Sequence, residues 1–454
     1  MTDSLTARVG ALLDARLERN VAPPVVLALS GGGDSMALLH IAAGWARAAG
    51  RRLLAITVDH GLNPDAAAWS RRCAEAARAV GADWIERRWE GDKPATGLPA
   101  AARHARHALI AEAARDAGAK VVLIAHTADD IAESDWMRAR GTTLGGLREW
   151  SPSPAWPEGR GLMLLRPMLN ERREDLRAWL RGRGQGWIED PGNEGFGRGK
   201  ARRALLPVPE GGGRIVYDPT TGLRLAERGD ASSAERVRGM AATGWHRNLS
   251  PFRASPIAGA PGRSSPLPLG EGFIWAGEAL AMTLLCAAGH DRLPRSERLA
   301  ALADRLAGGD PFTATLAGAR IEASADRVII GREAGELKRR APEPLALYTD
   351  TPAVWDGRYE ITACAAGWSV IPTLGRLNRL SKADRALADT VPPWGRGALP
   401  VLIRDGSDAP VLAWREAEVR ALAPRRLSLA LGETTQECDL HGTIHGETPP
   451  PDLF

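Results

Sequence analysis

A glycine-rich turn between two apolar segments constrains the fold of this chain more than any other stretch. The run Val25–Leu29 is apolar and partly β-branched, and it stops at the sequence SGGGDS of residues 30–35. The apolar periodicity from there to His40 predicts that a helix begins where the turn ends. Glycines let the backbone approach a ligand closely, and a helix start offers N–H groups and the positive end of the dipole. The stretch therefore predicts a phosphate or pyrophosphate site between a buried strand and a helix.

The spacing within the turn excludes two common nucleotide-binding motifs. A Walker loop needs a Lys directly before the Ser or Thr, and Asp34 holds that place. A Rossmann loop needs G-x-G-x-x-G, which the same Asp34 interrupts. SGGGDS is instead similar to SGG-x-DS, the PP-loop of ATP pyrophosphatases, which cleave ATP between the α- and β-phosphates. A plain glycine turn that joins a strand to a helix is the alternative interpretation. On the resemblance, the residues that bind ATP are Ser30, Gly31, Gly32, Gly33, Asp34 and Ser35.

Composition limits the number of domains and the class of protein. The chain has 454 residues, enough for two or three domains, and its net charge of +4 is compatible with nucleic acid without requiring it. Its four cysteines are far apart and form no C-x-x-C, which argues against a zinc ribbon, an iron–sulfur site or a disulfide framework. The N-terminus is unlike a signal peptide, and the most apolar segment, 273–289, is too short to span a bilayer. We expect a cytoplasmic protein without a membrane partner.

Strands alternate with helices in the first part of the chain, which predicts an α/β fold with a doubly wound parallel sheet. In such sheets ligands bind at the carboxyl ends of the strands. The glycine turn follows one predicted strand, Asp59-His60-Gly61 follows the strand 53–58, and His126-Thr127 follows the strand 121–125. We expect these three segments to converge in space.

A change of composition after Pro207 predicts further domains. Glycine and proline clusters follow it, and such a composition does not easily bury a core. Helical periodicity then resumes, and a small α+β region comes after it. The predicted parts are a catalytic ATP-binding domain at 1–207, a partly disordered linker or insertion at 208–272, a helical middle domain at 273–342, a small α+β domain at 343–431 and a flexible tail at 432–454.

A second group of chemistry-bearing residues lies in AHTADDIAES, residues 125–134. Asp130, Glu133 and Ser134 occur at i, i+3 and i+4, so a helix would place them on one face. Clustered carboxylates beside a phosphate loop suit Mg²⁺, and the resemblance to the PP-loop enzymes implies Asp34 and Asp130 as its ligands. A carboxylate in this position also suits a general base. Ordinary capping of a helix by acidic residues is the alternative interpretation.

Further motifs extend the likeness beyond the glycine turn. They are VDHGL at 58–62, AARHARH at 101–107, RPML at 166–169, and EDPGN at 189–193 with an arginine-rich stretch after it. Together with SGGGDS and AHTADDIAES they resemble the motifs of the tRNA(Ile)-lysidine synthetase family, a branch of the PP-loop ATP pyrophosphatases. The likeness covers most of the chain except 208–272 and the tail. Two departures are His107, where the family has Tyr, and a shortened segment at 134–147.

The resemblance implies a fold, a reaction and its partners. The fold is that of the adenine nucleotide alpha hydrolase-like proteins. The reaction joins free L-lysine to C2 of the wobble cytidine in tRNA(Ile) with a CAU anticodon. ATP first adenylates the cytidine with release of pyrophosphate, and the lysine amine then displaces AMP to give lysidine. The resemblance implies that the domains at 273–342 and 343–431 bind tRNA. ATP and Mg²⁺ are the implied cofactors, and a homodimer is compatible with the sequence.

The resemblance also implies roles for individual residues. Val58, His60 and His126 would bind the nucleotide with the glycine turn. Asp34, Asp130, Glu133 and Arg103 would be catalytic. For every arginine, a solvated surface position is the alternative. The arginines implied in tRNA binding are Arg106, Arg198, Arg202 and Arg203.

Three other functions compete with this interpretation. A tRNA 2-thiolation enzyme would use cysteines near the site, but Cys73 has no partner in the sequence. An NAD or GMP synthetase would share SGGGDS but not the C-terminal domains. A non-catalytic RNA-binding module would not need the carboxylates of Asp34, Asp130 and Glu133.

Overall fold

A computed structural model of the chain describes residues 4–140, 146–189, 214–218, 222–226, 277–324, 327–340, 342–404 and 409–441. The chain divides into two compact units. The first comprises Met1–Ala128, Leu147–Asp190 and Pro268–Phe454, and the second comprises Asp129–Gly146 and Pro191–Leu267. Each unit is described by itself.

In its described part, the second unit contains helix α5 (Ala128–Arg138) from Asp129 onward and an antiparallel hairpin of β7 (Arg214–Asp218) and β8 (Gly222–Ala226). The hairpin lies within the predicted linker 208–272, and the rest of that linker up to residue 272 lies outside the described residues.

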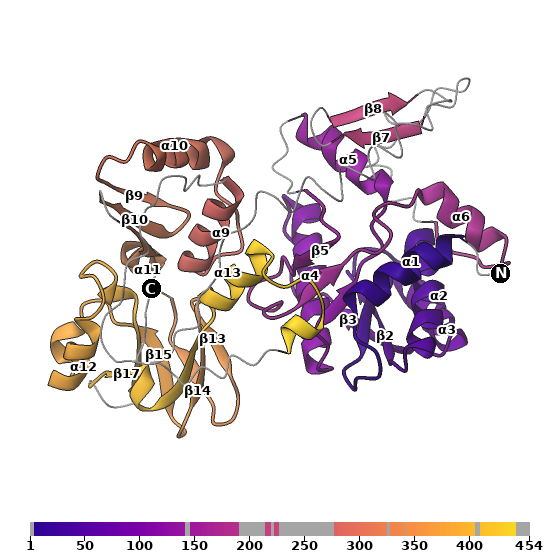
Figure 1. Ribbon diagram of the computed structural model, residues 1–454. Coiled ribbons are helices and arrows are strands. Elements are labelled where there is room, and N and C mark those ends of the chain that lie inside the picture. The colour runs from indigo at the N-terminus through magenta and orange to yellow at the C-terminus, as the bar shows by residue number, and fades with distance from the viewer. Residues whose placement is uncertain are drawn as a thin grey trace. The chain divides into compact units, whose positions relative to one another are not determined.

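A six-stranded sheet in the order β3-β2-β1-β4-β6-β5 confirms the predicted α/β class. Figure 1 labels its strands β2, β3 and β5. All neighbouring strands are parallel except β5, which runs antiparallel to β6. The chain order reverses at β1, which pairs with β2 on one side and β4 on the other. A topological switch point therefore lies between the carboxyl ends of β1 and β4, the place where such sheets bind ligands. The strands are β1 (Val25–Ala28), β2 (Leu53–Asp59), β3 (Asp83–Arg88), β4 (Val121–Leu123), β5 (Trp150–Pro152) and β6 (Met163–Leu165).

Both faces of the sheet are covered, so its central strands are apolar on both sides. Leu27 belongs to one buried core, which α1, α2, α3 and α6 complete. Val26, its neighbour in β1, belongs to the other core, which α4 covers through Ile110. The alternation follows from the two-residue period of a strand. The helices are α1 (Ser4–Arg16), α2 (Gly33–Ala48), α3 (Ala66–Ala79), α4 (Leu98–Asp116) and α6 (Arg173–Arg181).

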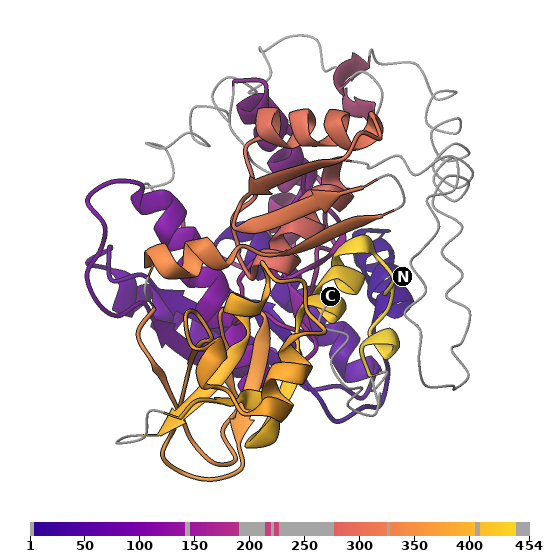
Figure 2. The ribbon, with the colours of Figure 1, turned by 90° about the vertical axis from the view of Figure 1, so that its left-hand side faces the viewer.

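The middle part of the chain, residues 277–340, combines helices with the antiparallel sheet β11-β10-β9 (salmon in Figure 2). Ile321 on the central strand packs against Leu280 and Leu284 of α9. The sequence predicts helices for this part and two short strands around a polar turn at 323–326, and the structure has a third strand, β9, beside those two. Its elements are α9 (Gly277–Ala288), α10 (Ser296–Ala307), β9 (Phe312–Leu316), β10 (Ala319–Ala323), β11 (Val328–Arg332) and α11 (Ala334–Arg340).

The C-terminal part has the predicted small α+β architecture. Its strands form two sheets, β12-β15-β16-β17 and β13-β14-β18. Ile361 and Val370 are fully buried in their shared core. None of the helices in the described ranges combines the length and hydrophobicity that a bilayer-spanning segment needs. The elements are β12 (Leu345–Leu347), β13 (Ala353–Trp355), β14 (Tyr359–Ala363), β15 (Trp368–Pro372), α12 (Lys382–Ala388), β16 (Pro400–Arg404), β17 (Val411–Leu412), β18 (Ala417–Ala421) and α13 (Ala423–Leu431).

The first ten residues of the predicted flexible tail, 432–441, are packed against the α/β region, which corrects that prediction for them. The Glu437 side chain is 0% exposed and forms an ion pair with Arg51 at 2.8 Å. The short helix η5 (Cys438–Leu440) follows, and Leu440 joins the core of the α/β region. The sequence shows no sign of this packing because Arg51 lies 386 positions away. Residues 442–454 lie outside the described residues.

Candidate functional site

The glycine turn lies at the carboxyl end of β1, on the switch point of the sheet. Helix α2 begins at Gly33, and its N-cap residue Gly32 makes no side-chain capping hydrogen bond. Gly32 has no side chain that could cap the first turn of α2, and a helix start of this kind is an arrangement that binds phosphate. The Ser35 hydroxyl donates to the Gly32 carbonyl oxygen at 2.9 Å and lies 3.1 Å from the Ser30 hydroxyl. These bonds fix the turn around the helix start.

Gly31 is the position in the turn that requires glycine. Its φ of +81° lies in the left-handed region. A Cβ there would lie 2.6 Å from Ile188 Cδ1 and 3.0 Å from Cys73 Sγ. The Ile188 N–H donates to the Gly31 carbonyl oxygen at 2.8 Å, so the turn is held from both sides. Burial raises the pKa of the Cys73 thiol, so Cys73 packs beneath the turn as a neutral group.

Helix α6 contributes a cation that the sequence did not single out. Arg173 Nε lies 3.1 Å from Asp34 Oδ2, and the two side chains are 15% and 22% exposed. The carboxylate of Asp34 is thus held at the start of α2, where its oxygens are the hard donors that Mg²⁺ prefers. Arg173 follows the RPML motif closely in sequence, and that proximity was the only available signal for it.

Helix α6 and the segment after it cover the glycine turn. Trp187 and Arg177 both lie against Gly33, where an added Cβ would be 3.5 Å from each side chain. The Trp187 indole N–H donates to Glu189 at 2.6 Å, and Arg177 forms an ion pair with Glu189 at 3.4 Å. Sequence reasoning missed this cover because residues 187–189 have no periodicity that indicates a contact with residue 33.

Two of the predicted nucleotide-binding residues lie at the end of β2. Val58 is half-buried on the strand, and the ring of His60 meets Trp89 edge-on at 6.3 Å between centroids. Burial lowers the pKa of His60, and the charge of Arg106 acts in the same direction. His60 is therefore neutral at physiological pH, and Arg106 lies close enough to influence it.

A cluster of basic side chains surrounds the end of β4. Arg166 Nε donates to His126 Nδ1 at 3.0 Å, and both residues are buried. Burial lowers the pKa of His107 to about 2, and the charges of Arg106, Arg103, His126 and Arg166 act in the same direction. Predicted catalytic, nucleotide-binding and tRNA-binding residues thus share one electropositive region, which suits a polyphosphate.

The predicted carboxylates on α5 lie on a helix as expected. Asp130, Glu133 and Ser134 are 4%, 1% and 3% exposed and share one helical face. The Ser134 hydroxyl donates to the Asp130 carbonyl oxygen at 2.7 Å. From Asp129 onward α5 belongs to the second unit, so the pairing of Asp130 with Asp34 around Mg²⁺ stays a prediction.

The arginines predicted to bind tRNA are only partly among the described residues. Arg106 lies on α4, within the basic cluster described above. Arg198, Arg202 and Arg203 lie outside the described residues, so their role stays a prediction.

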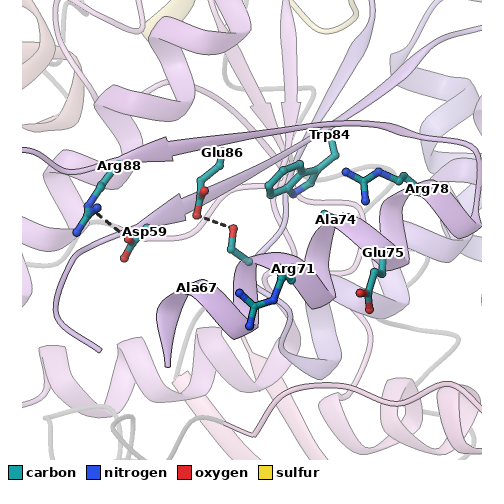
Figure 3. Close-up of a pocket in the computed structure, with 10 residues that line it drawn as sticks. Asp59, Ala67, Arg71, Ala74, Glu75, Arg78, Trp84, Glu86 and Arg88 are labelled. Atoms are coloured by element: carbon teal, nitrogen blue, oxygen red, sulfur yellow. Dashed lines mark hydrogen bonds and ion pairs between the residues drawn. The ribbon is translucent and has the colours of Figure 1, made fainter. Parts of the chain in front are cut away.

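A polar pocket of about 470 Å³ lies along α3 and β3, at the edge of the sheet (Figure 3). Arg71 and Glu75 of α3 and Glu86 of β3 line it. Asp59 also lines it and pairs with Arg88 at 3.6 Å, as the dashed line shows. Its walls carry balanced charge and include no residue of the glycine turn.

Comparison of the sequence with known proteins identifies relatives of this chain. A family model described as a PP-loop domain matches residues 3–208. The chain is 40% identical over 448 residues to a tRNA(Ile)-lysidine synthase of Caulobacter vibrioides, covering 95% of this chain and 98% of the relative. It is 37% identical over 370 residues to a tRNA(Ile)-lysidine synthase of Hyphomonas neptunium, covering 80% of this chain and 94% of the relative.

Solved structures show a weaker likeness. The U34-tRNA thiolase NcsA of Methanococcus maripaludis, with its [4Fe-4S] cluster, is 14% identical with a TM-score of 0.37, covering 44% of this chain and 71% of the thiolase. An NH₃-dependent NAD synthetase of Campylobacter jejuni is 13% identical with a TM-score of 0.28, covering 45% of this chain and 86% of the synthetase. Both TM-scores are too low to support an argument about function.

Proposed function

Because the chain belongs to the tRNA(Ile)-lysidine synthase family, we propose that it joins L-lysine to C2 of the wobble cytidine in tRNA(Ile) with a CAU anticodon. The observation that carries the proposal is the 40% identity to one such synthase over 95% of the chain. The glycine turn at the switch point and the basic cluster around it support the ATP-dependent part of the reaction. A tRNA substrate also makes the cytoplasm the proposed location.

In the proposed first step, O2 of the cytidine attacks the α-phosphate of ATP and pyrophosphate leaves. The N–H groups at the start of α2 and the hydroxyls of Ser30 and Ser35 hold the leaving pyrophosphate. Arg103 and Arg106 offset the charge that develops on the phosphates. Mg²⁺, when held by Asp34 and Asp130, supplies further charge neutralisation. The cytidine has to leave the anticodon stack to reach this site.

In the proposed second step, the ε-amine of lysine attacks C2 of the adenylated cytidine and AMP leaves. The amine must be neutral to attack, so a base has to take its proton. The carboxylates of Asp130 and Glu133, which share one face of α5, are the groups proposed for this role. The product is lysidine.

A labelling assay tests the proposed reaction. Purified protein is incubated with ATP, radiolabelled lysine and either tRNA(Ile) or methionine tRNA, both with a CAU anticodon. We expect label only in the isoleucine tRNA, with one pyrophosphate and one AMP released for each lysine incorporated. An absence of label, together with base modification when a thiol donor replaces lysine, would show that the chain is a thiolation enzyme instead.

A variant tests the proposed role of Asp34. Asp34→Ala should lower pyrophosphate release by at least about 100-fold, the order of effect of removing a preorganised charge from a reacting centre. Binding of tRNA, measured by filter retention, should stay within about threefold because phosphate contacts spread over many basic residues dominate it. Glu75→Ala on the exposed side of α3 is the matched control and should change neither quantity. Equal losses of pyrophosphate release and tRNA binding in Asp34→Ala would contradict the role.

A further inference from the structure

A hydrogen bond between two buried basic side chains carries a further inference. β4 and β6 are neighbours in the sheet, with Leu123 opposite Leu165. The residues that follow these strands therefore meet, and Arg166 Nε donates to His126 Nδ1 at 3.0 Å. Arg166 and His126 are 6% and 7% exposed. Two basic groups in such contact are compatible only if one of them is neutral.

The chemistry of the two groups decides which nitrogen carries the proton. A guanidinium has only donors, and burial lowers the pKa of Arg166 no further than about 10, so it stays charged at neutral pH. Its partner atom must accept, so Nδ1 of His126 carries no proton. The imidazole is then the neutral tautomer with its proton on Nε2.

The Arg166 guanidinium is itself held in place by the edge strand β5 and the residues just before it. Arg166 Nη1 donates to the Arg148 carbonyl oxygen at 2.7 Å and to the Ser151 hydroxyl at 2.9 Å. The backbone N–H of Arg166 donates to the Glu149 carbonyl oxygen at 2.8 Å. The donor that faces His126 therefore has little freedom to turn away.

The surroundings oppose a second proton on His126. Arg166 contacts the ring directly. Burial is the main cause that lowers the pKa of Arg166, and the nearby positive charge of Arg103 lowers it further. His107, which is neutral, is also close to His126. A charged imidazole here would lie beside the buried cation of Arg166 with its Nδ1 proton directed at a donor.

We propose that Arg166 is a positioning residue that holds His126 as the neutral Nε2–H tautomer, so that His126 serves the bound nucleotide only as a hydrogen-bond donor. The proposal rests on the proposed function for the identity of the nucleotide site. Nε2 then donates to a phosphate or ribose oxygen, and the ring does not act as a base. A group other than His126 therefore accepts the proton of the lysine amine.

Nitrogen NMR of the full chain labelled with [¹⁵N]histidine tests the tautomer directly. The chain has nine histidines, and the His126 signals are assigned by their loss in His126→Gln. We expect a pyrrole-type Nε2 and a pyridine-type Nδ1, unchanged from about pH 5.5 to 8, the range where an ordinary histidine titrates. A pyrrole-type Nδ1, or a ring that titrates in this range, would overturn the proposal.

Variants of Arg166 test its role. Arg166→Met removes the donor and should let His126 exchange tautomers and titrate. ATP binding should weaken about five- to tenfold, which corresponds to the loss of one hydrogen bond. Arg166→Lys keeps a charged donor and should retain much of the wild-type tautomer. Ser151→Ala, the matched control, removes a different contact of the guanidinium and should leave the tautomer unchanged.

Each variant result has a defined meaning. An unchanged tautomer in folded Arg166→Met overturns the proposal. If that variant does not fold, the wild-type spectrum and Arg166→Lys decide the question. The NMR signals do not depend on lysine or tRNA chemistry, so the failure of the proposed function would leave this test intact.

Discussion

At the scale of single residues, two adjacent glycines of the turn differ in how strongly their positions require glycine. Gly31 has a φ of +81° and touches Ile188, so both its backbone and its surroundings exclude a side chain. Gly32 has a φ of −70°, and a Cβ there would lie 3.7 Å from the nearest atom, the Ser30 hydroxyl. The sequence shows three equivalent glycines, and only the backbone geometry separates them.

This difference predicts unequal effects of alanine in chemical denaturation. Gly31→Ala should lower the free energy of unfolding by about 1–3 kcal/mol, because alanine in the left-handed region is strained and Ile188 must move. Gly32→Ala, the matched control, should change it by less than about 0.5 kcal/mol. Equal losses in the two variants would show that the strain at Gly31 is unimportant.

At the scale of elements, an ionic network joins α11 to the end of β11 and to the β13–β14 turn. Arg332 is 1% exposed in its side chain and pairs with Glu336 of α11 and with Asp356 in the turn. His290 and Arg340 also face the Glu336 carboxylate, each at 3.1 Å. Burial acts to raise the pKa of Glu336, but the hydrogen bonds from Arg332 and His290 outweigh burial and lower it to about 2.

The low pKa of Glu336 predicts how the network responds to acid. Because the folded pKa lies below the unfolded value of 4.5, the stabilisation is complete above that pH and is lost as the pH falls towards 2. Glu336→Gln should cost about 2–3 kcal/mol near pH 7, and the difference from wild type should shrink below about pH 4.5. Urea titrations at several pH values measure this difference. Exposed Glu343→Gln is the control, and a difference for Glu336→Gln that stays constant with pH would refute the expectation.

At the scale of the whole molecule, residues near the C-terminus complete the N-terminal α/β region. The carboxylate of Glu437 accepts two hydrogen bonds from Arg51, at 2.8 and 3.0 Å, and a third from the Glu18 N–H. The Arg51 guanidinium also donates to the Pro23 carbonyl oxygen. The Trp150 indole N–H donates to the Thr434 carbonyl oxygen at 3.0 Å. The fold of the first 190 residues therefore includes a segment that is very distant in sequence.

This attachment predicts a large cost when its carboxylate is removed. Glu437→Gln leaves the buried charge of Arg51 uncompensated and should lower the free energy of unfolding by about 3–5 kcal/mol. Thermal denaturation measures the loss. Glu433→Gln alters an exposed carboxylate in the same segment and should have little effect. If the double variant Arg51→Met/Glu437→Leu were no more stable than Glu437→Gln, the unpaired charge would not be the cause of the loss.

The sequence by itself determined whatever depends on neighbouring residues. The glycine turn between a strand and a helix, the alternation of strands and helices, and the shared face of Asp130 and Glu133 follow from local periodicity and turn chemistry. The tertiary structure decided which distant groups meet: Arg173 with Asp34, Arg166 with His126, and Arg51 with Glu437. Periodicity reports which face of an element is buried, but it does not report the partner of a buried charge. That partner depends on how separate strands and helices come together, as at the neighbouring ends of β4 and β6.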